Sequence, residues 1–285
     1  MIVRVAFGAV ALVLAVPAAA QDTPPPAAPA DIDLAGDSVT LGAGMVYMPD
    51  YEGSGDYRFQ AAPGAIGSIS GIGFVVAGNR ASVDLVPNRP GSAWDFQLGP
   101  IAALNFNRTS TRSIDDPRIR ALGKVGTAIE LGGYVGIGKT GVITSPYDKL
   151  SLSVSYRHDV AGAHDSGIIQ PTLTYLTPLS RKAAVTVFAS AEHAGRGYAD
   201  AYFGITPAQS VASGLPVYNG RSGWKNWSLG GLGTVALTGD LLHGFKLVGG
   251  GLYRGMVGSY ADSPVVRIAG SRGQWMGVVG LAYTF

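Results

Sequence analysis

Two histidine–aspartate pairs are the side chains in this sequence best suited to acid–base chemistry. The pairs are His158–Asp159 and His164–Asp165, and they stand close together in the chain. A carboxylate beside an imidazole can activate a water molecule or a serine. The Gly-x-Ser-x-Gly elbow of serine hydrolases is absent, and no two histidines have metal-ligand spacing. We therefore expect no catalytic residue and no metal site, and keep a hydrolase at the rim of the fold as the third functional hypothesis.

A glycine-rich stretch offers a second possible chemistry, the binding of phosphate. Residues 133–140 match the spacing of a P-loop, and residues 136–141 match a dinucleotide-binding pattern. A P-loop needs a following helix whose N-terminus holds the phosphate, but here Gly141, Pro146 and a polar turn follow. With 42 glycines among 285 residues, such matches arise by chance. We expect no cofactor.

Composition narrows the class of protein further. Charged residues make up 14% of the chain, against about 25% in average soluble domains. The formal net charge is +2 and no basic stripe is present, so we expect no nucleic-acid partner. The chain has no cysteine, which excludes disulfides, thiolate catalysis and cysteine-based zinc sites.

The N-terminal residues predict export. Residues 1–20 form the pattern of a cleavable signal peptide, with Arg4, an apolar run over 5–16 and small residues over 18–20. The alternative is a membrane anchor, but a spanning helix needs about 20 apolar residues. Residues 21–36 contain four prolines, which predicts a disordered periplasmic tether.

Residues 37–285 alternate between apolar and polar side chains. The alternation is clearest over 39–47, 94–107, 124–137 and 150–159, which are long enough to cross hydrocarbon as tilted strands. A soluble β-sandwich also alternates, but its polar faces usually carry more charge than these, which are mostly Ser, Thr, Asn and Gly. The segment 274–285 ends on Phe285 and resembles the last strand of bacterial outer-membrane barrels. The pattern predicts an all-β, transmembrane, antiparallel up-and-down barrel whose apolar row faces lipid.

The expected barrel has twelve strands. Ten remains the alternative, because the strands at 71–78 and 81–87 are weak and the count must stay even. With twelve, the connections 108–121, 196–223 and 259–272 lie at the outer end, and short turns lie at the periplasmic end. The expected strands are 37–48, 57–66, 71–78, 81–87, 94–107, 122–138, 149–160, 166–178, 183–195, 224–238, 244–258 and 273–285.

Six charged side chains share the row that the barrel would turn inward. They could line a path for small solutes, or they could neutralise one another, because an unpaired buried charge is costly. A narrow pore is therefore the second functional hypothesis. These side chains are Glu130, Arg157, Asp159, Glu192, Lys246 and Arg254.

Three blocks of the sequence resemble the signatures of the MipA/OmpV family of outer-membrane barrels. They lie at 39–54, 202–218 and 261–272, in family order. The family-signature residues, whose role we leave unassigned, are Pro49, Asp50, Tyr51, Glu52, Gly53, Ser54, Tyr202, Phe203, Gly204, Thr206, Pro207, Gly214, Leu215, Pro216, Asp262, Ser263, Pro264, Arg267, Ser271 and Arg272.

The resemblance implies a barrel in the outer membrane of a Gram-negative cell, without known enzymatic activity. The member that gives the family its name is a scaffold that joins a murein-degrading lytic transglycosylase to a murein-synthesising polymerase. The expected partners are therefore outer-membrane lipid, murein-remodelling enzymes and, during insertion, the barrel-assembly machinery. One difficulty is that the signature loops lie at the outer end, whereas murein enzymes are periplasmic. An explanation is that Pro49, Gly53, Pro207 and Pro216 fix loops that fold over or into the barrel mouth.

Overall fold

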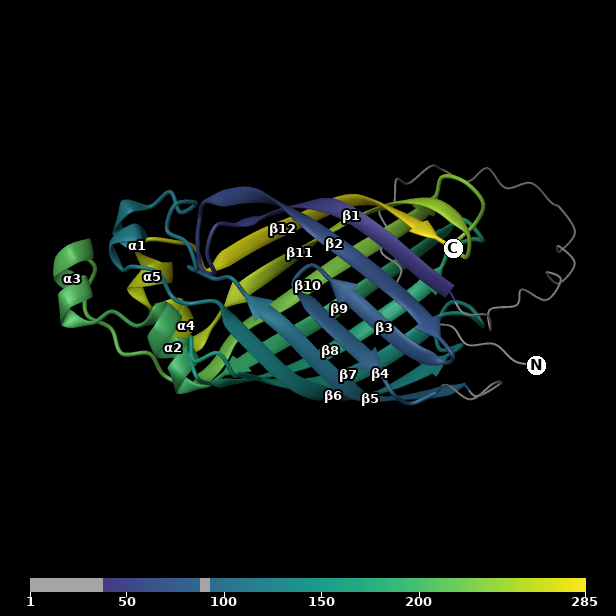
Figure 1. Ribbon diagram of the computed structural model, residues 1–285, viewed down its shortest axis with the longest axis horizontal. Coiled ribbons are helices and arrows are strands. Elements are labelled where there is room, and N and C mark those ends of the chain that lie inside the picture. Colours follow the sequence, from purple (N-terminus) through teal and green to yellow (C-terminus); the bar gives the residue numbers. More distant parts are fainter. Residues whose placement is uncertain (1–37, 88–92) are drawn as a thin grey trace, which may run out of the picture.

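A closed barrel of antiparallel strands forms the body of the molecule (Figure 1). The computed structural model describes residues 38–87 and 93–285, so the expected signal peptide and tether lie outside the described residues. Within these ranges the strands are β1 (Ser38–Pro49), β2 (Tyr57–Ile69), β3 (Ile72–Ala77), β4 (Arg80–Asp84), β5 (Trp94–Asn105), β6 (Ala128–Thr140), β7 (Lys149–Asp159), β8 (Gly167–Pro178), β9 (Ala183–Ala194), β10 (Gly223–Ala236), β11 (Gly244–Met256) and β12 (Gly273–Thr284).

These strands confirm the prediction of twelve, and the alternative of ten is wrong. The weak pair forms two separate short strands, β3 and β4, that meet at Gly78 and Asn79. The strand expected over 122–138 begins only at Ala128. The reason is that Leu122 and Val125 pack into an apolar core outside the barrel wall instead of joining the sheet.

The barrel closes between its first and last strands. Leu41 pairs with Tyr283 and Met45 with Val279 along this seam, so neither strand keeps an open edge. The outward row is apolar and exposed: Trp275 is 65% and Phe285 63% exposed. The alternation therefore places its apolar row on the outside, as a lipid-facing surface requires.

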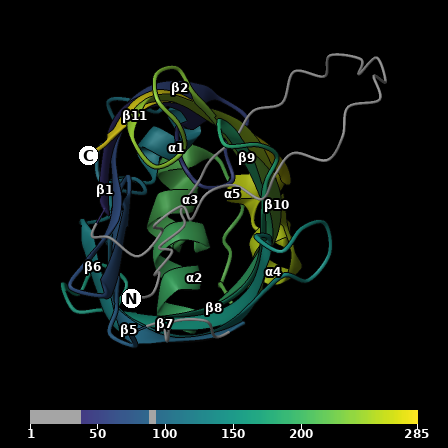
Figure 2. The same cartoon turned by 90° about the vertical axis from the view of Figure 1, so that its right-hand side faces the viewer.

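The two ends of the barrel differ (Figures 1 and 2). At one end, here called the termini end, β1 begins and β12 finishes, and the strands are joined by turns. At the other end lie the five described helices: α1 (Pro117–Ala121), α2 (Arg196–Phe203), α3 (Pro207–Ser213), α4 (Gly258–Asp262) and α5 (Pro264–Arg267). None of these helices is long and apolar enough to cross a membrane.

The long connections expected at 108–121, 196–223 and 259–272 all lie at this helical end, opposite the start of β1 and the end of β12. Together with the shorter connections they form what we call the cap: residues 50–56, 106–127, 160–166, 195–222 and 257–272. Looking along the barrel axis, Figure 2 shows α2 and α3 within the outline of the barrel, and Figure 1 shows that they lie at and beyond its mouth.

At the termini end, one buried carboxylate organises the β6–β7 turn. Asp148 accepts hydrogen bonds from the backbone N–H groups of Val142 at 2.6 Å and Ile143 at 2.9 Å, and from that of Thr144. The Tyr175 hydroxyl donates to the same carboxylate at 2.8 Å. Burial acts to raise the pKa of Asp148, but these donors stabilise its charged form and lower its pKa well below the ordinary value of 3.8.

This turn is expected to loosen in acid. A carboxylate with a depressed folded-state pKa contributes its stability above pH 3.8 and loses it as pH falls through the lower folded value. Hydrogen exchange of the amides at 142–144 should therefore be slow and insensitive to this group above about pH 5, and should accelerate at lower pH beyond the intrinsic rate. An Asp148→Asn variant should exchange faster at neutral pH and show no such step. A wild-type protection factor that stays flat down to pH 2 would contradict the expectation.

Candidate functional site

Among the residues that the structure describes, an apolar core of eighteen buried side chains lies mainly in the cap. Its most deeply buried large side chains include Tyr202, Phe203 and Tyr260, each at most 1% exposed. Phe203 and Tyr260 meet edge to face, with ring centroids 5.2 Å apart. Aromatic pairs of this kind contribute roughly 0.5–1.5 kcal/mol beyond the area they bury. The cap is therefore a packed unit and not a set of loose loops.

The first signature block enters this core directly after β1. The Tyr51 hydroxyl donates to the carbonyl of Ala269 at 2.9 Å, and Ser54 presents its own carbonyl to the Gln274 side chain at 3.2 Å. Gly53 adopts a φ of 98°, a left-handed conformation, and its carbonyl accepts the N–H of Ser271 at 2.8 Å. The turn thus joins the first block to the third.

The second and third blocks are joined in the same way. The Ser263 hydroxyl donates to the carbonyl of Phe203 at 2.6 Å, where α2 ends. In the second block, Thr206 and Gln209 form a capping box at the start of α3, with Pro207 in its first turn. Gly214 ends α3 with a φ of 72°, and Leu215 returns the chain to the core at 1% exposure.

Most of the signature residues therefore meet in the cap, although they come from three distant parts of the chain. Those that the structure leaves exposed lie around α3, which protrudes from the cap (Figure 1), or on the outer side of α4 and α5. They are Thr206, Pro207, Gly214, Pro216, Asp262, Arg267 and Arg272. The other signature residues are buried or half-buried.

Gly53 offers a direct test of how closely the first and third blocks must approach. A Cβ atom at this position would lie 2.6 Å from the Val266 Cγ2 atom, closer than carbon atoms can pack. Gly53→Ala is expected to destabilise the cap by about 2–4 kcal/mol, since it adds this clash to the cost of a left-handed alanine. Gly123→Ala is the matched control, because Gly123 has a φ of 82° and nothing within 4 Å of its Cβ position. Urea-dependent proteolysis of the cap would measure both, and equal losses would contradict the expected clash.

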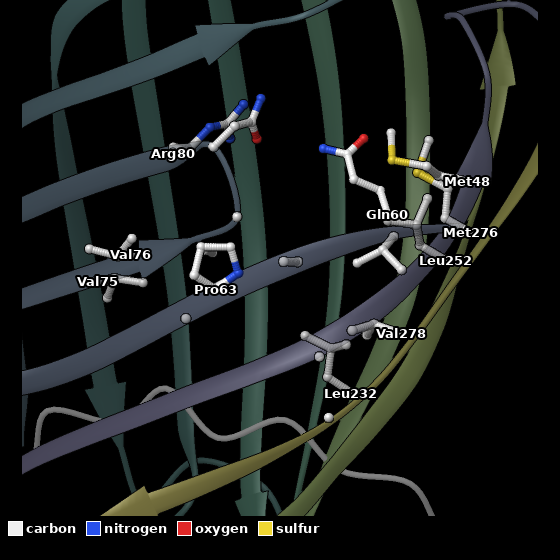
Figure 3. Close-up of a pocket in the computed structure, with 18 of the residues that line it drawn as sticks. Met48, Gln60, Pro63, Val75, Val76, Arg80, Leu232, Leu252, Met276 and Val278 are labelled. Atoms are coloured by element: carbon white, nitrogen blue, oxygen red, sulfur yellow. The ribbon is translucent and has the colours of Figure 1, made fainter. Parts of the chain in front are cut away.

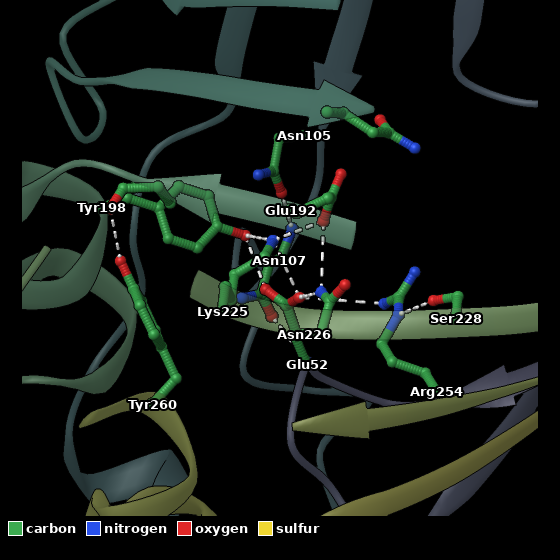
Figure 4. Close-up of polar contacts among 12 residues, drawn as sticks. Glu52, Asn105, Asn107, Glu192, Tyr198, Lys225, Asn226, Ser228, Arg254 and Tyr260 are labelled. Atoms are coloured by element: carbon green, nitrogen blue, oxygen red, sulfur yellow. Dashed lines mark hydrogen bonds and ion pairs between the residues drawn. The ribbon is translucent and has the colours of Figure 1, made fainter. Parts of the chain in front are cut away.

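A network of charges lies where the cap meets the lumen (Figure 4). The Lys225 ammonium is 2.9 Å from a Glu52 carboxylate oxygen in the cap and 2.8 Å from a Glu192 oxygen on β9. The Tyr198 hydroxyl on α2 donates to Glu52 at 2.6 Å, and the Lys225 ammonium donates to that hydroxyl at 3.1 Å. Burial, followed by the charge of Glu52, raises the pKa of Tyr198 well above its ordinary value, so this hydroxyl remains a donor.

The network continues along the inner wall of the barrel. The Arg157 guanidinium lies 2.9 Å from Glu130 and 3.2 Å from Glu192. Arg80 reaches Glu192 at 3.8 Å, and Arg254 reaches Glu52 at 3.7 Å, from the cavity side. Four cations thus surround three carboxylates, and this pairing offsets the desolvation cost that would otherwise make buried charges unstable.

The charged side chains predicted to face inward do so, but only some of them form ion pairs with one another. Glu130, Arg157 and Glu192 neutralise one another, as expected. Asp159 instead accepts backbone N–H groups, including that of His164 at 2.7 Å. Lys246 forms no ion pair within the described part of the chain and donates to Thr284.

The two histidine–aspartate pairs do not assemble a single site. His158 lies on the outer row, 3.5 Å from Asp165, which is largely exposed. His164 is buried in the cap, 3.5 Å from Glu130 and packed against the Tyr198 ring at 5.0 Å. Among residues 38–87 and 93–285, no group of three His, Asp or Glu side chains could hold a metal ion. Residues 133–140 lie on β6, with no helix after them.

Three members of the network, Arg80, Tyr198 and Lys225, were not predicted from the sequence. Lys225 lies at a register shift between Trp224 and Asn226, which turns it inward against the regular alternation. Tyr198 lies in a connection that carries no periodic signal.

Below the network, the lumen holds a cavity of about 960 Å³ (Figure 3). It extends from the cap, at Glu52 and Lys225, to the termini end, at Lys246 and Thr284. Ligand pockets in proteins commonly measure about 300–1,000 Å³. The volume of this cavity therefore lies within the range of ligand-binding pockets.

The model of the family described as MltA-interacting protein, MipA, matches residues 41–285. A sequence comparison with curated proteins finds no match.

Two solved barrels are among those similar in fold. The toluene transporter TbuX of Ralstonia pickettii has a TM-score of 0.35 and 9% identity, over 87% of this chain and 89% of that one. OmpT of Vibrio cholerae has a TM-score of 0.34 and 7% identity, over 88% and 97%. At these TM-scores, neither likeness supports any argument about this chain.

Proposed function

Since this chain belongs to the MipA family, we propose that it is a non-enzymatic scaffold of the outer membrane that binds murein-remodelling enzymes. The observation that carries the proposal is the match of the family model over residues 41–285, a family described by its interaction with MltA. The buried charged groups are consistent with a structural role, because they are held by one another and by the cap. Residues 1–20 would direct export, residues 21–36 would form the tether, and the barrel-assembly machinery would insert residues 37–285.

We infer the place of docking from where β1 begins and β12 finishes. In an outer-membrane barrel with an even strand count, both ends of the barrel sequence face the periplasm, where murein lies. The termini end would then face the partner, and the signature residues at the opposite end would serve to build the cap. This removes the conflict between outward signature loops and a periplasmic partner.

The β6–β7 turn is the part of the termini end that we propose for this contact. It presents Ile143 at 67% and Tyr147 at 56% exposure, on a backbone that Asp148 holds in place. Exposed apolar and aromatic side chains on a fixed backbone are typical of the centres of protein interfaces.

Crosslinking in intact envelopes, at native expression, tests the proposal. The tagged protein should recover a lytic transglycosylase, and the double variant Ile143→Ser, Tyr147→Ser should lose most of that recovery. The matched control is Val211→Ser with Val217→Ser, because these side chains are 89% and 49% exposed on the cap. Recovery of no murein enzyme by the wild-type protein would refute the scaffold role. Loss of recovery in the cap variant alone would place the contact at the opposite end.

A further inference from the structure

The lumen has one polar and one apolar half. On β7, β8 and β9 most inward side chains are polar or charged, with Ser or Thr at positions 151, 153, 155, 172, 174, 186 and 190. On β10, β11, β12, β1 and β2 the inward row is mostly aliphatic or Gly, and the cavity lies against this half (Figure 3). Its apolar lining includes Met48, Leu232, Val248, Leu252, Met276 and Val278. A lumen that serves only water and ions is expected to be polar throughout, so this wall suits a hydrocarbon occupant.

The cavity carries an excess of positive charge towards the cap. Its described lining contains six basic and four acidic side chains, and five of the basic ones lie near the cap with the four acidic ones, since Lys246 lies at the termini end. Arg80 and Arg254 contact their carboxylates at 3.8 and 3.7 Å, longer than the 2.7–2.9 Å of a strong charge-assisted hydrogen bond. Their side chains are 38% and 23% exposed, towards the cavity that they line. Arg58 also lines the cavity and forms no ion pair with any described residue. These arginines would bind an anionic group of a ligand in the part of the cavity nearest the cap.

The barrel wall is incomplete beside this cavity. Pairing of β2 with β3 ends at Gly64, and the Pro63 carbonyl accepts the N–H of Gly78 at 2.8 Å. Pro63 has no N–H to return, so the ladder stops there. Beyond it, residues 57–62 of β2 pair with β1 alone among the described strands.

The far side of this gap is the end of β5. The β3–β4 hairpin reaches β5 only as far as Leu104, whose N–H donates to Asn79 at 2.8 Å. Above it, the Glu52 N–H donates to Asn107 at 3.0 Å and Arg58 donates to Ser113 at 2.6 Å, which closes the upper rim. We call the space between residues 60–63, 78–79 and 104–107 the wall opening; all of these residues line the cavity.

Residues of the outward row, such as Ala61 and Phe106, line the cavity at this opening together with inward residues such as Arg80. The cavity therefore communicates with the lipid-facing surface while the cap covers the axial mouth. Phe59, at 69% exposure, lies on the outer surface of the rim.

We propose that the lumen binds a single-chain amphiphile with an anionic headgroup, which enters sideways through the wall opening. The headgroup, a carboxylate or a phosphate, pairs with Arg80 and Arg254. The hydrocarbon chain lies against the apolar half of the lumen, where each methylene removed from water adds to the affinity. The side entrance suits such a ligand, because its chain never has to leave an apolar environment.

Binding of a fluorescent long-chain fatty acid to the full-length protein in amphipol tests the site. Ala62→Trp, which fills the apolar half, and Arg80→Gln with Arg254→Gln, which removes the headgroup charges, should each weaken the Kd at least tenfold. Ala189→Trp is the matched control, because Ala189 lies on the outer row of β9, away from the opening. An unchanged Kd in either cavity variant would overturn the proposal.

Competition identifies the headgroup and its source. Hexadecanoate and hexadecyl phosphate should both displace the probe, and the tighter of the two names the headgroup. Hexadecanol, which has the chain without the charge, should compete at least tenfold more weakly. Equal competition by hexadecanol would overturn the anionic site.

Labelling at the wall opening tests the route. The chain has no cysteine, so Ala61→Cys can be modified alone with a bulky maleimide. The modification should slow uptake of the probe at least tenfold, whereas the same label on Ala189→Cys should leave the rate unchanged. Uptake at the unmodified rate through a fully labelled Ala61→Cys protein would exclude lateral entry.

Discussion

Replacing Lys225 by methionine is expected to loosen the cap by about 3–5 kcal/mol, the usual cost of removing one partner from a buried ion pair. The ammonium of Lys225 lies between Glu52 and Glu192, at 2.9 and 2.8 Å. Without it, two buried carboxylates face each other, with more distant arginines as their remaining cationic partners. Because Glu52 belongs to the cap and Glu192 to the barrel, the repulsion acts across the junction of the two.

Native-state hydrogen exchange of the α2 amides would measure this loss, since those amides exchange when the cap opens. Lys182→Met is the control, because Lys182 is exposed at the termini end. Adding Glu192→Gln to the Lys225 variant should restore part of the loss, since it neutralises one of the two carboxylates. Exchange rates within about threefold of wild type, equivalent to roughly 0.7 kcal/mol, would show that the junction does not depend on this cation.

Removal of the α2–α3 connection is expected to turn a silent barrel into a conducting one. Residues 196–222 lie at and beyond the barrel mouth at the helical end, and the cavity beneath them extends to Lys246 and Thr284 at the termini end. A variant with these residues replaced by a short Gly-Ser linker should show discrete steps in a planar bilayer. The intact protein should show none, because the cap core and the charge network close the mouth.

The matched control replaces the turn 237–243 at the opposite end, which leaves the cap in place. Heat-modifiable mobility on a gel would establish that each variant still forms a barrel. A folded deletion variant that stays silent would show that another part of the chain closes the lumen. Steps from the intact protein would favour the narrow pore over the scaffold as its function.

The barrel itself could be predicted because the face on which a strand residue lies depends only on its position along that strand. A period of two places side chains on opposite faces of any strand, so the outward row from Leu41 to Tyr47 and the inward position of Arg157 follow from parity alone. Because the number of strands must be even, β3 and β4 were predicted to be two strands and not one. The polar and apolar halves of the lumen follow from the same parity, and could have been derived from the inward row of β10 to β12.

The cap could not be predicted in this way, because its order depends on contacts between distant segments. The α2 helix has eight residues, too few to be stable alone. Its residues Tyr202 and Phe203 become buried only when the segments that carry Tyr51 and Tyr260 pack into the same core. The register shift at Lys225 is likewise invisible to a pattern that assumes regular pairing. The resemblance to a family identified the three blocks, but only the folded chain brings them to one place.

The short β3–β4 hairpin also has a consequence for the surrounding bilayer. At about 3.3 Å per residue, the six residues of β3 extend about 20 Å, roughly half the length of the twelve-residue β1. On this side the hydrophobic girdle is correspondingly low, and a membrane adapts to such a mismatch by thinning. Acyl chains beside the hairpin would be compressed and disordered. The barrel would thus sit in its leaflets asymmetrically, with the thinnest lipid beside the wall opening.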